Sequence, residues 1–149
     1  MTPISLLEFA RTGAFAGIMI GHSRQLIESI LGLPETWGMP PTRIETAEIW
    51  KYGDIEFYFH DDELWMIFSD TFEIPVGGAS INLDPWIIRY GMRQHDFEAG
   101  LRQEHITFTC AENRYNDGEI DLTTDAKVCF TFRESASEYG PAGLCAMQA

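Results

Sequence analysis

Histidine, cysteine and nucleophile motifs would be the first sign of catalysis or metal binding in this chain. The four histidines are scattered, and none has a second histidine at the four-residue spacing of a helical zinc site. The three cysteines, Cys110, Cys129 and Cys145, form no Cys-x-x-Cys pair. No Gly-x-Ser-x-Gly, phosphate loop or dinucleotide fingerprint occurs. We therefore expect no enzymatic activity, no metal and no cofactor.

Carboxylates are abundant, and two acidic clusters could in principle hold a hard cation. The first is Asp61-Asp62-Glu63, and the second surrounds Asn116-Asp117-Gly118. A calcium or magnesium site draws more oxygen ligands at staggered spacing. Both clusters are also typical of tight turns. We interpret them as solvated turns, although an acid–base pair among the carboxylates is not excluded by sequence alone.

A partner-binding surface is the more specific hypothesis. Residues 55–60 alternate, so that Ile55, Phe57 and Phe59 would face a core while the residues between them face the opposite side. A large aromatic residue within an acidic rim is typical of a protein-binding site. The candidate site residues are Glu56, Tyr58, His60 and Trp65, with Thr107, Thr109, Asp121 and Thr131 as possible counterparts later in the chain. The return strand 64–68 is apolar on both sides, so Trp65 and Ile67 are alternatives for the exposed position.

Composition limits the class of partner. The 149 residues carry 23 acidic and 10 basic side chains, a formal charge of −13. Nucleic acid and anionic membranes need a positive surface, so we expect neither as a partner. A basic protein remains possible. Three cysteines are typical of free thiols in a reducing compartment, residues 1–20 do not resemble a secretory signal, and we expect a cytoplasmic location.

Helix and strand patterns predict an α+β fold. Ser23 suits an N-cap, Leu26, Ile27, Ile30 and Leu31 give one apolar face, and Gly32 suits a left-handed C-terminal residue. We also expect a first helix capped by Thr2 and a helix after Asp84-Pro85. The other expected elements are a helix at 93–102 and strands at 43–50, 55–60, 64–68, 72–76, 105–112, 119–123 and 127–133.

An internal repeat organises these elements. At an offset of 70 residues Gly21 aligns with Gly91, and Glu28 with Glu98. At an offset of 63 residues Tyr52 aligns with Tyr115. We expect a single domain of two tandem αα-βββ units, about 1–77 and 78–134, with helices packed on one face of an antiparallel sheet. Residues 135–149 would form an irregular C-terminal tail.

Several segments carry a family resemblance. They are Ile20-Gly21-His22-Ser23-Arg24-Gln25-Leu26-Ile27, Leu31-Gly32-Leu33-Pro34, Trp50-Lys51-Tyr52 and Phe57-Tyr58-Phe59-His60-Asp61-Asp62. They resemble the "I-x-x-G-M-[ST]-x-x-x-V", "L-G-x-P", "W-x-Y" and "F-x-x-D" motifs of the SmpA/OmlA (BamE) family. Two such units in tandem are similar to the β-lactamase inhibitory protein fold, whose sheets form one concave surface. A lipoprotein signal is missing, so the outer-membrane role is not implied.

A second resemblance lies in Leu33-Pro34-Glu35-Thr36-Trp37-Gly38. This stretch resembles the start of SMI1/KNR4-type (SUKH) immunity proteins, and the likeness is confined to this one motif. Together these resemblances imply a protein-binding module of the immunity or inhibitor type, neutralising a toxin or an enzyme. Two alternatives stay open. One is a small-ligand-binding or enzymatic domain that uses the concave sheet, and the other is an assembly factor of the SmpA type.

Overall fold

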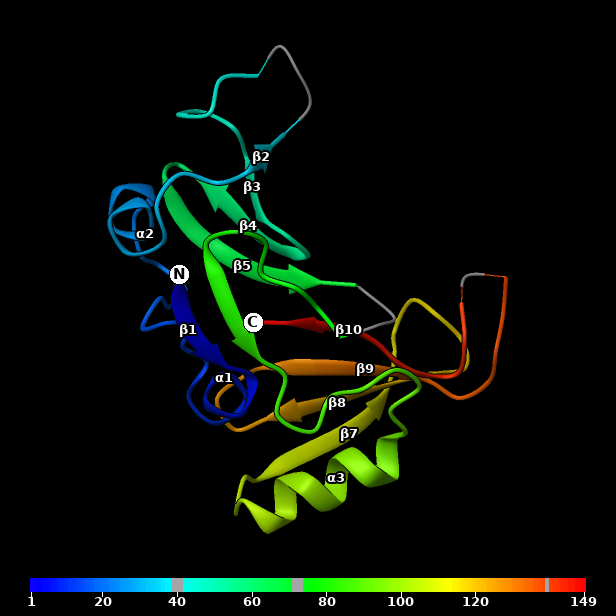
Figure 1. Ribbon diagram of the computed structural model, residues 1–149. Helices are drawn as coiled ribbons and strands as arrows, with labels where there is room; N and C mark the ends of the chain where they lie inside the picture. The colour runs from blue at the N-terminus through cyan, green and yellow to red at the C-terminus, as the bar shows by residue number, and fades with distance from the viewer. Residues whose placement is uncertain (39–41, 71–73, 139) are drawn as a thin grey trace.

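The computed structural model describes residues 1–38, 42–70, 74–138 and 140–149. Three short helices and ten strands make up the described chain (Figure 1). The helices are α1 (Leu6–Thr12), α2 (Arg24–Leu31) and α3 (Gln94–Gln103). The strands are β1 (Thr2–Ser5), β2 (Thr36–Trp37), β3 (Ile49–Tyr52), β4 (Ile55–His60), β5 (Glu63–Ser69), β6 (Ile81–Asp84), β7 (Phe108–Glu112), β8 (Glu119–Thr124), β9 (Cys129–Arg133) and β10 (Gly143–Gln148).

Eight strands form one antiparallel sheet in the order β2-β3-β4-β5-β10-β9-β8-β7. The last strand, β10, therefore lies in the middle of this sheet, beside β5 (Figure 1). Its ladder with β5 is short, and Ala149 extends it by exchanging two hydrogen bonds with Ile67 at 2.9 and 3.1 Å. A separate parallel pair joins β1 to β6. The chain is mixed α and β with a mostly antiparallel sheet, as predicted.

One hydrophobic core connects the helices with one face of the sheet. Phe9 of α1, Ile27 of α2 and Phe97 of α3 are fully buried in the same cluster as the inward residues of the strands. The ring of Phe97 lies 4.6 Å from that of Phe130 on β9. Burial of these apolar side chains removes hydrophobic surface from water and stabilises the packing of the helices on the sheet.

Helix α2 has the predicted N-cap and ends at the predicted glycine, although Gly32, with ψ of −173°, does not adopt the left-handed helical conformation. The Ser23 side chain accepts a hydrogen bond from the Leu26 amide at 3.2 Å, and Gly32 follows the last turn with φ of +79°. A positive φ strains residues that have a Cβ, which explains the glycine. Leu26, however, is 39 % exposed, so its prediction as a core residue is wrong.

Several predicted boundaries are also wrong. Thr2 and Pro3 lie in a strand, and Ser5 caps α1 instead. The strand predicted over 43–50 begins only at Ile49, because turns occupy residues 44–46. The segment after Asp84 is a turn rather than a helix, although the Asp84 carboxylate accepts from the Trp86 amide at 3.0 Å as a cap would. In the predicted edge strand 72–76, residues 74–76 form no strand, and residues 72–73 lie outside the described chain.

The prediction of an irregular tail over 135–149 is the largest error. Residues 143–148 form β10, which pairs with β9 on one side and β5 on the other. Leu144 and Met147 pack into the core from this strand. The second half of the molecule therefore extends to the end of the described chain.

Candidate functional site

The sheet face opposite the helices, here called the open face, carries most of the predicted site. Tyr58 and Glu56 alternate with the buried residues of β4, so they point away from the core. A β-bulge between β4 and β5 places Trp65 beside Tyr58, with ring centroids 5.8 Å apart. Trp65 is 53 % exposed, whereas Ile67 is 1 % exposed. Of the two alternatives for the exposed position on this strand, Trp65 therefore faces outward and Ile67 faces the core.

Hydrogen bonds fix the orientation of Tyr58. Its hydroxyl donates to the Glu56 carboxylate at 2.6 Å, and Lys51 forms an ion pair with the same carboxylate at 2.7 Å. Partial burial acts to raise the pKa of Glu56, but the hydrogen bonds from Lys51 and Tyr58 outweigh it and lower that pKa overall. Burial, followed by the hydrogen bond to Glu56 and the charges of Glu56 and Asp70, raises the pKa of Tyr58 to about 12.

His60 is separate from this group. It ends β4, its side chain is 83 % exposed, and its imidazole lies 3.5 Å from the Asp61 carboxylate at the hairpin tip. Within the described residues, its ion pair is with Asp61, whereas Tyr58 contacts Glu56, Trp65 and Phe68. Of the four predicted site residues, the structure brings together Glu56, Tyr58 and Trp65.

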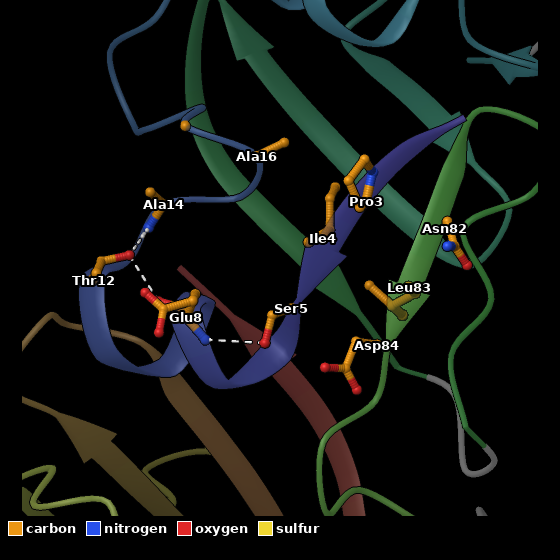
Figure 2. Close-up of a pocket in the computed structure, with 11 residues that line it drawn as sticks. Pro3, Ile4, Ser5, Glu8, Thr12, Ala14, Ala16, Asn82, Leu83 and Asp84 are labelled. Atoms are coloured by element: carbon orange, nitrogen blue, oxygen red, sulfur yellow. Dashed lines mark hydrogen bonds between the residues drawn. The ribbon is translucent and has the colours of Figure 1, made fainter.

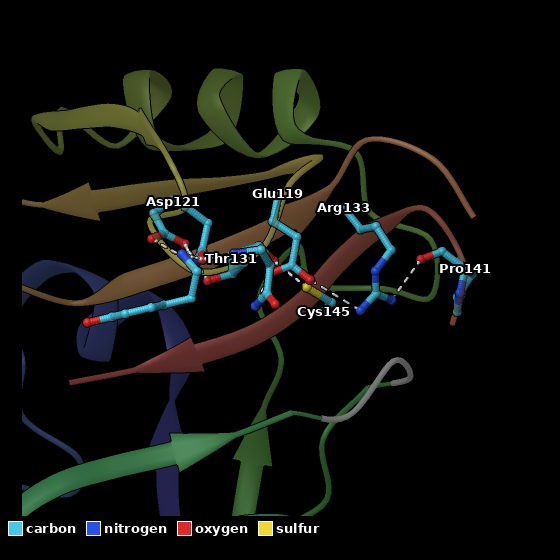
Figure 3. Close-up of polar contacts among 9 residues, drawn as sticks. Glu119, Asp121, Thr131, Arg133, Pro141 and Cys145 are labelled. Atoms are coloured by element: carbon cyan, nitrogen blue, oxygen red, sulfur yellow. Dashed lines mark hydrogen bonds and ion pairs between the residues drawn. The ribbon is translucent and has the colours of Figure 1, made fainter. Parts of the chain in front are cut away.

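A polar network occupies the open face on the other side of β10 (Figure 3). Asp121 on β8 accepts hydrogen bonds from Asn113, at 3.1 Å to each carboxylate oxygen, and from the Thr131 hydroxyl at 2.8 Å. Arg133 and Glu119 pair at 3.4 Å, with side chains only 11 % and 13 % exposed. A shallow hollow lies between this network and the aromatic group, with Phe68, Asp70, Ala146 and Gln148 among its lining residues.

Neither Cys145 nor Cys129 is activated as a nucleophile. Burial raises the pKa of Cys145 to about 11, with a further contribution from Glu119, and burial likewise raises the pKa of Cys129. Both thiols are therefore protonated near neutral pH, and the thiolate is the reactive form. The Cys145 thiol instead donates to the Thr131 carbonyl at 3.4 Å. Within the described residues, no group of three potential metal ligands occurs.

The three cysteines lie on three different strands. Cys110 and Cys129 lie on β7 and β9, which β8 separates, so they are not neighbours. All three thiols are free, but Cys110 is exposed rather than buried.

A second hollow lies between the β1–β6 pair and the loop after α1 (Figure 2). Its polar groups serve local structure. The Ser5 hydroxyl accepts from the Glu8 amide at 3.5 Å, and the Thr12 hydroxyl donates to the Glu8 carbonyl at 2.7 Å while accepting from Ala14. Because these side chains already cap the helix ends, we prefer the open face as the functional surface.

Comparison with known proteins adds no assignment. No protein-family model matches the chain, and no curated protein or solved structure shows significant similarity to it. Among the described helices, none has the length and apolar character needed to cross a membrane.

Sequence reasoning missed the central part of this surface. Phe68 and Asp70 follow Trp65 on or beside β5, and Ala146 and Gln148 belong to the unexpected strand β10. The signal that could have found them is the stretch Leu144-Cys145-Ala146-Met147, which is apolar enough for a short, covered strand.

Proposed function

We propose that this protein is a non-enzymatic, cytoplasmic protein-binding module that docks a basic partner through the open face. Its role in this proposal is that of an immunity or inhibitor protein, which neutralises a toxin or an enzyme. The observation that carries the proposal is Trp65, a largely exposed aromatic side chain whose ring contacts that of Tyr58. Ordered aromatic anchors supply binding energy at a low cost in side-chain entropy.

Charge supports a basic partner. The formal charge of the chain is −13, and Glu56 and Asp70 lie close to Tyr58 on the open face. Such a field accelerates association with a positively charged protein and makes the association sensitive to salt. Many toxic nucleases are basic for the same electrostatic reason, since they bind nucleic acid.

We further propose that the fold consists of two tandem units, with the strand correspondence revised. The sheet order places β2 to β5 on one side of the β5–β10 junction and β7 to β10 on the other. An offset of 63 residues would relate β5 to β9, which run parallel in this sheet. A twofold axis perpendicular to the sheet relates antiparallel strands, so β5 corresponds better to β10. The units are then 1–77 and 78–149.

Local geometry supports the same correspondence. Gly21 and Gly91 both adopt positive φ, at +95° and +69°, shortly before α2 and α3. The Leu64 amide of β5 donates to the His22 carbonyl at 2.9 Å, and the Leu144 amide of β10 donates to the Met92 carbonyl at 2.8 Å. His22 and Met92 are equivalent at the 70-residue offset. This arrangement is what the likeness to tandem inhibitory proteins implies.

Affinity capture at two salt concentrations tests the function. The immobilised protein is presented with lysate of its source cells, and bound proteins are compared among wild type, Trp65→Ala and Tyr90→Ala. Tyr90 is 63 % exposed, lies in the turn before α3 and does not line the hollow of the open face, so it is a matched aromatic control. We expect a basic protein that wild type and Tyr90→Ala retain, that Trp65→Ala loses, and that high salt releases. Equal retention by the wild type and both variants, or no capture at either salt concentration, would contradict the proposal.

A further inference from the structure

The two edges of the eight-stranded sheet are unequal. Strand β2 at one edge has only two residues, a length that limits pairing with another chain. Strand β7 at the other edge has five, and Thr109 to Glu112 are all exposed. Strand β7 contains no lysine or proline, the residues that commonly block edge pairing; its sequence is Phe108-Thr109-Cys110-Ala111-Glu112. In the described part of the chain, only β8 pairs with β7.

The ladder between β7 and β8 determines which backbone groups of β7 bond to β8 and which point away from the sheet. The Asn113 amide donates to the Glu119 carbonyl at 2.9 Å, and the Asp125 amide donates to the Thr107 carbonyl at 3.0 Å. Both pairs continue the register in which Cys110 lies opposite Leu122. Because hydrogen-bonded pairs alternate along an antiparallel ladder, the odd-numbered residues of β7 bond to β8. The amide and carbonyl groups of Phe108, Cys110 and Glu112 therefore point away from the sheet.

Side chains around this edge are complementary to a second copy of the same edge. Phe108, Cys110 and Glu112 share the side of the sheet that α3 covers, since Cys110 contacts Glu98 at 3.5 Å and the Arg102 guanidinium lies over the Phe108 ring at 5.2 Å. An antiparallel twofold centred on Cys110 brings Phe108 opposite Glu112 of the second copy. Arg102 then lies beside that carboxylate, and the same contact occurs twice.

We propose that two copies of this chain associate edge to edge through β7, forming one continuous sixteen-stranded sheet. The outward amides and carbonyls at 108, 110 and 112 form the new ladder, and the Arg102–Glu112 pairs fix its register. The twofold axis runs perpendicular to the sheet, so both open faces lie on the same side. This proposal is independent of the partner-binding function, because β7 lies at the opposite end of the second half from Trp65.

Salt separates this association from partner binding. Each copy carries −13, so the two copies repel one another over distances that salt screens. We expect dimerisation to strengthen with salt, whereas binding of a basic partner weakens. The two proposals can thus fail separately.

Sedimentation equilibrium on the full chain, at low and high salt, tests the dimer. We expect Glu112→Arg to weaken dimerisation about tenfold or more. The introduced arginine side chain would lie beside Arg102 of the other copy, so two cations would meet at each end of the ladder. The double variant Arg102→Glu with Glu112→Arg restores the pairing. Cys110→Pro removes an outward amide without removing a bond to β8 and should abolish the dimer, while its melting temperature serves as the folding control.

Cross-linking reports the register. Cys110 is the one exposed cysteine of the three, and the twofold places it opposite its own copy at about 5.5 Å between Cα atoms. A short bismaleimide should yield a covalent dimer from wild type and none from Cys110→Ser. A chain that sediments as a monomer at every salt and protein concentration, or a dimer unaffected by Glu112→Arg and Cys110→Pro, overturns the proposal.

Discussion

Trp65 and Tyr58 touch one another, but they differ in what each contributes to folding. Trp65 is more than half exposed, and its ring contacts mainly Tyr58 among the aromatic side chains. Tyr58 is half-buried and also faces Phe68, with ring centroids 6.4 Å apart. The structure thus separates an exposed aromatic ring from the half-buried residue that supports it.

Replacing Trp65 with alanine should therefore leave folding almost unchanged. We expect a change in unfolding free energy within about 0.5 kcal/mol, which is typical of exposed positions. Affinity for a captured partner should fall by about 2 kcal/mol or more, as for other exposed aromatic anchors. Chemical denaturation and isothermal titration calorimetry measure the two quantities, with Tyr90→Ala as the control. Loss of the folded state in Trp65→Ala would show that this ring belongs to the core.

Tyr58 should make stability fall at alkaline pH. Its pKa is raised from 10.0 to about 12, so the unfolded chain releases this proton first. The contribution of the protonated Tyr58 hydroxyl to the free energy of unfolding is fully present below pH 10 and is lost as the pH rises toward 12. Burial also raises the pKa of Tyr52, so tyrosinate absorbance should show late titration of both groups, and Tyr58→Phe should lose one of these two late steps. Denaturation curves of Tyr58→Phe should also fall less steeply above pH 10 than those of the wild type.

At the scale of single elements, the helices α2 and α3 begin differently. Ser23 caps α2 through its side chain, whereas Arg93 precedes α3 without any side-chain cap. An uncapped helix start leaves amide groups to water and places a positive side chain near the positive end of the helix dipole.

Removing the cap of α2 and adding one to α3 should shift the free energy of unfolding in opposite directions. Ser23→Ala should cost about 1 kcal/mol, because the Leu26 amide loses its acceptor. Arg93→Asp should gain about 0.5 kcal/mol, since it supplies both an acceptor and a negative charge. Urea denaturation of both variants measures the difference. A gain from Ser23→Ala or a loss from Arg93→Asp of similar size would contradict this view of the helix starts.

Elements with strong local patterns were predictable. Residues 55–60 alternate without interruption, and β4 has these bounds. The N-cap and the glycine of α2 were found because both signals come from neighbouring residues. Strand β1 was not predictable, because Thr2-Pro3 resembles a helix start and the strand exists only through pairing with β6, at Ile81 and beyond. Distant pairing of this kind leaves little trace in local sequence.

At the scale of the whole molecule, β10 decides how the halves are joined. Sequence analysis predicted the two groups of strands but not the strand between them, because a short stretch rich in small residues becomes a strand only where β5 and β9 flank it. The same error hid half of the hollow on the open face. The candidate residues of the first half were predictable, since they lie on a locally patterned hairpin.

Met147 should therefore matter to both halves. It is 5 % exposed, and its β10 position pairs with Phe130 and Ser69. Met147→Ala should lower the free energy of unfolding by about 2–3 kcal/mol by leaving a cavity. Gln148→Ala, on the same strand but with an exposed side chain, is the control and should cost less than 1 kcal/mol. Calorimetry should show one cooperative transition in each variant, and two separate transitions in the wild type would contradict a shared core.

The central position of β10 also affects the order of folding. Ile67 and Ala149 exchange hydrogen bonds across more than half the length of the chain, so closing this junction costs loop entropy and is slow relative to forming the β4–β5 hairpin. During synthesis β5 is complete well before β10 leaves the ribosome. Until then, the β5 edge and the buried side of Ile67 are open to other nascent chains. Refolding yield should therefore depend on protein concentration, and chaperones that shield strand edges should raise it.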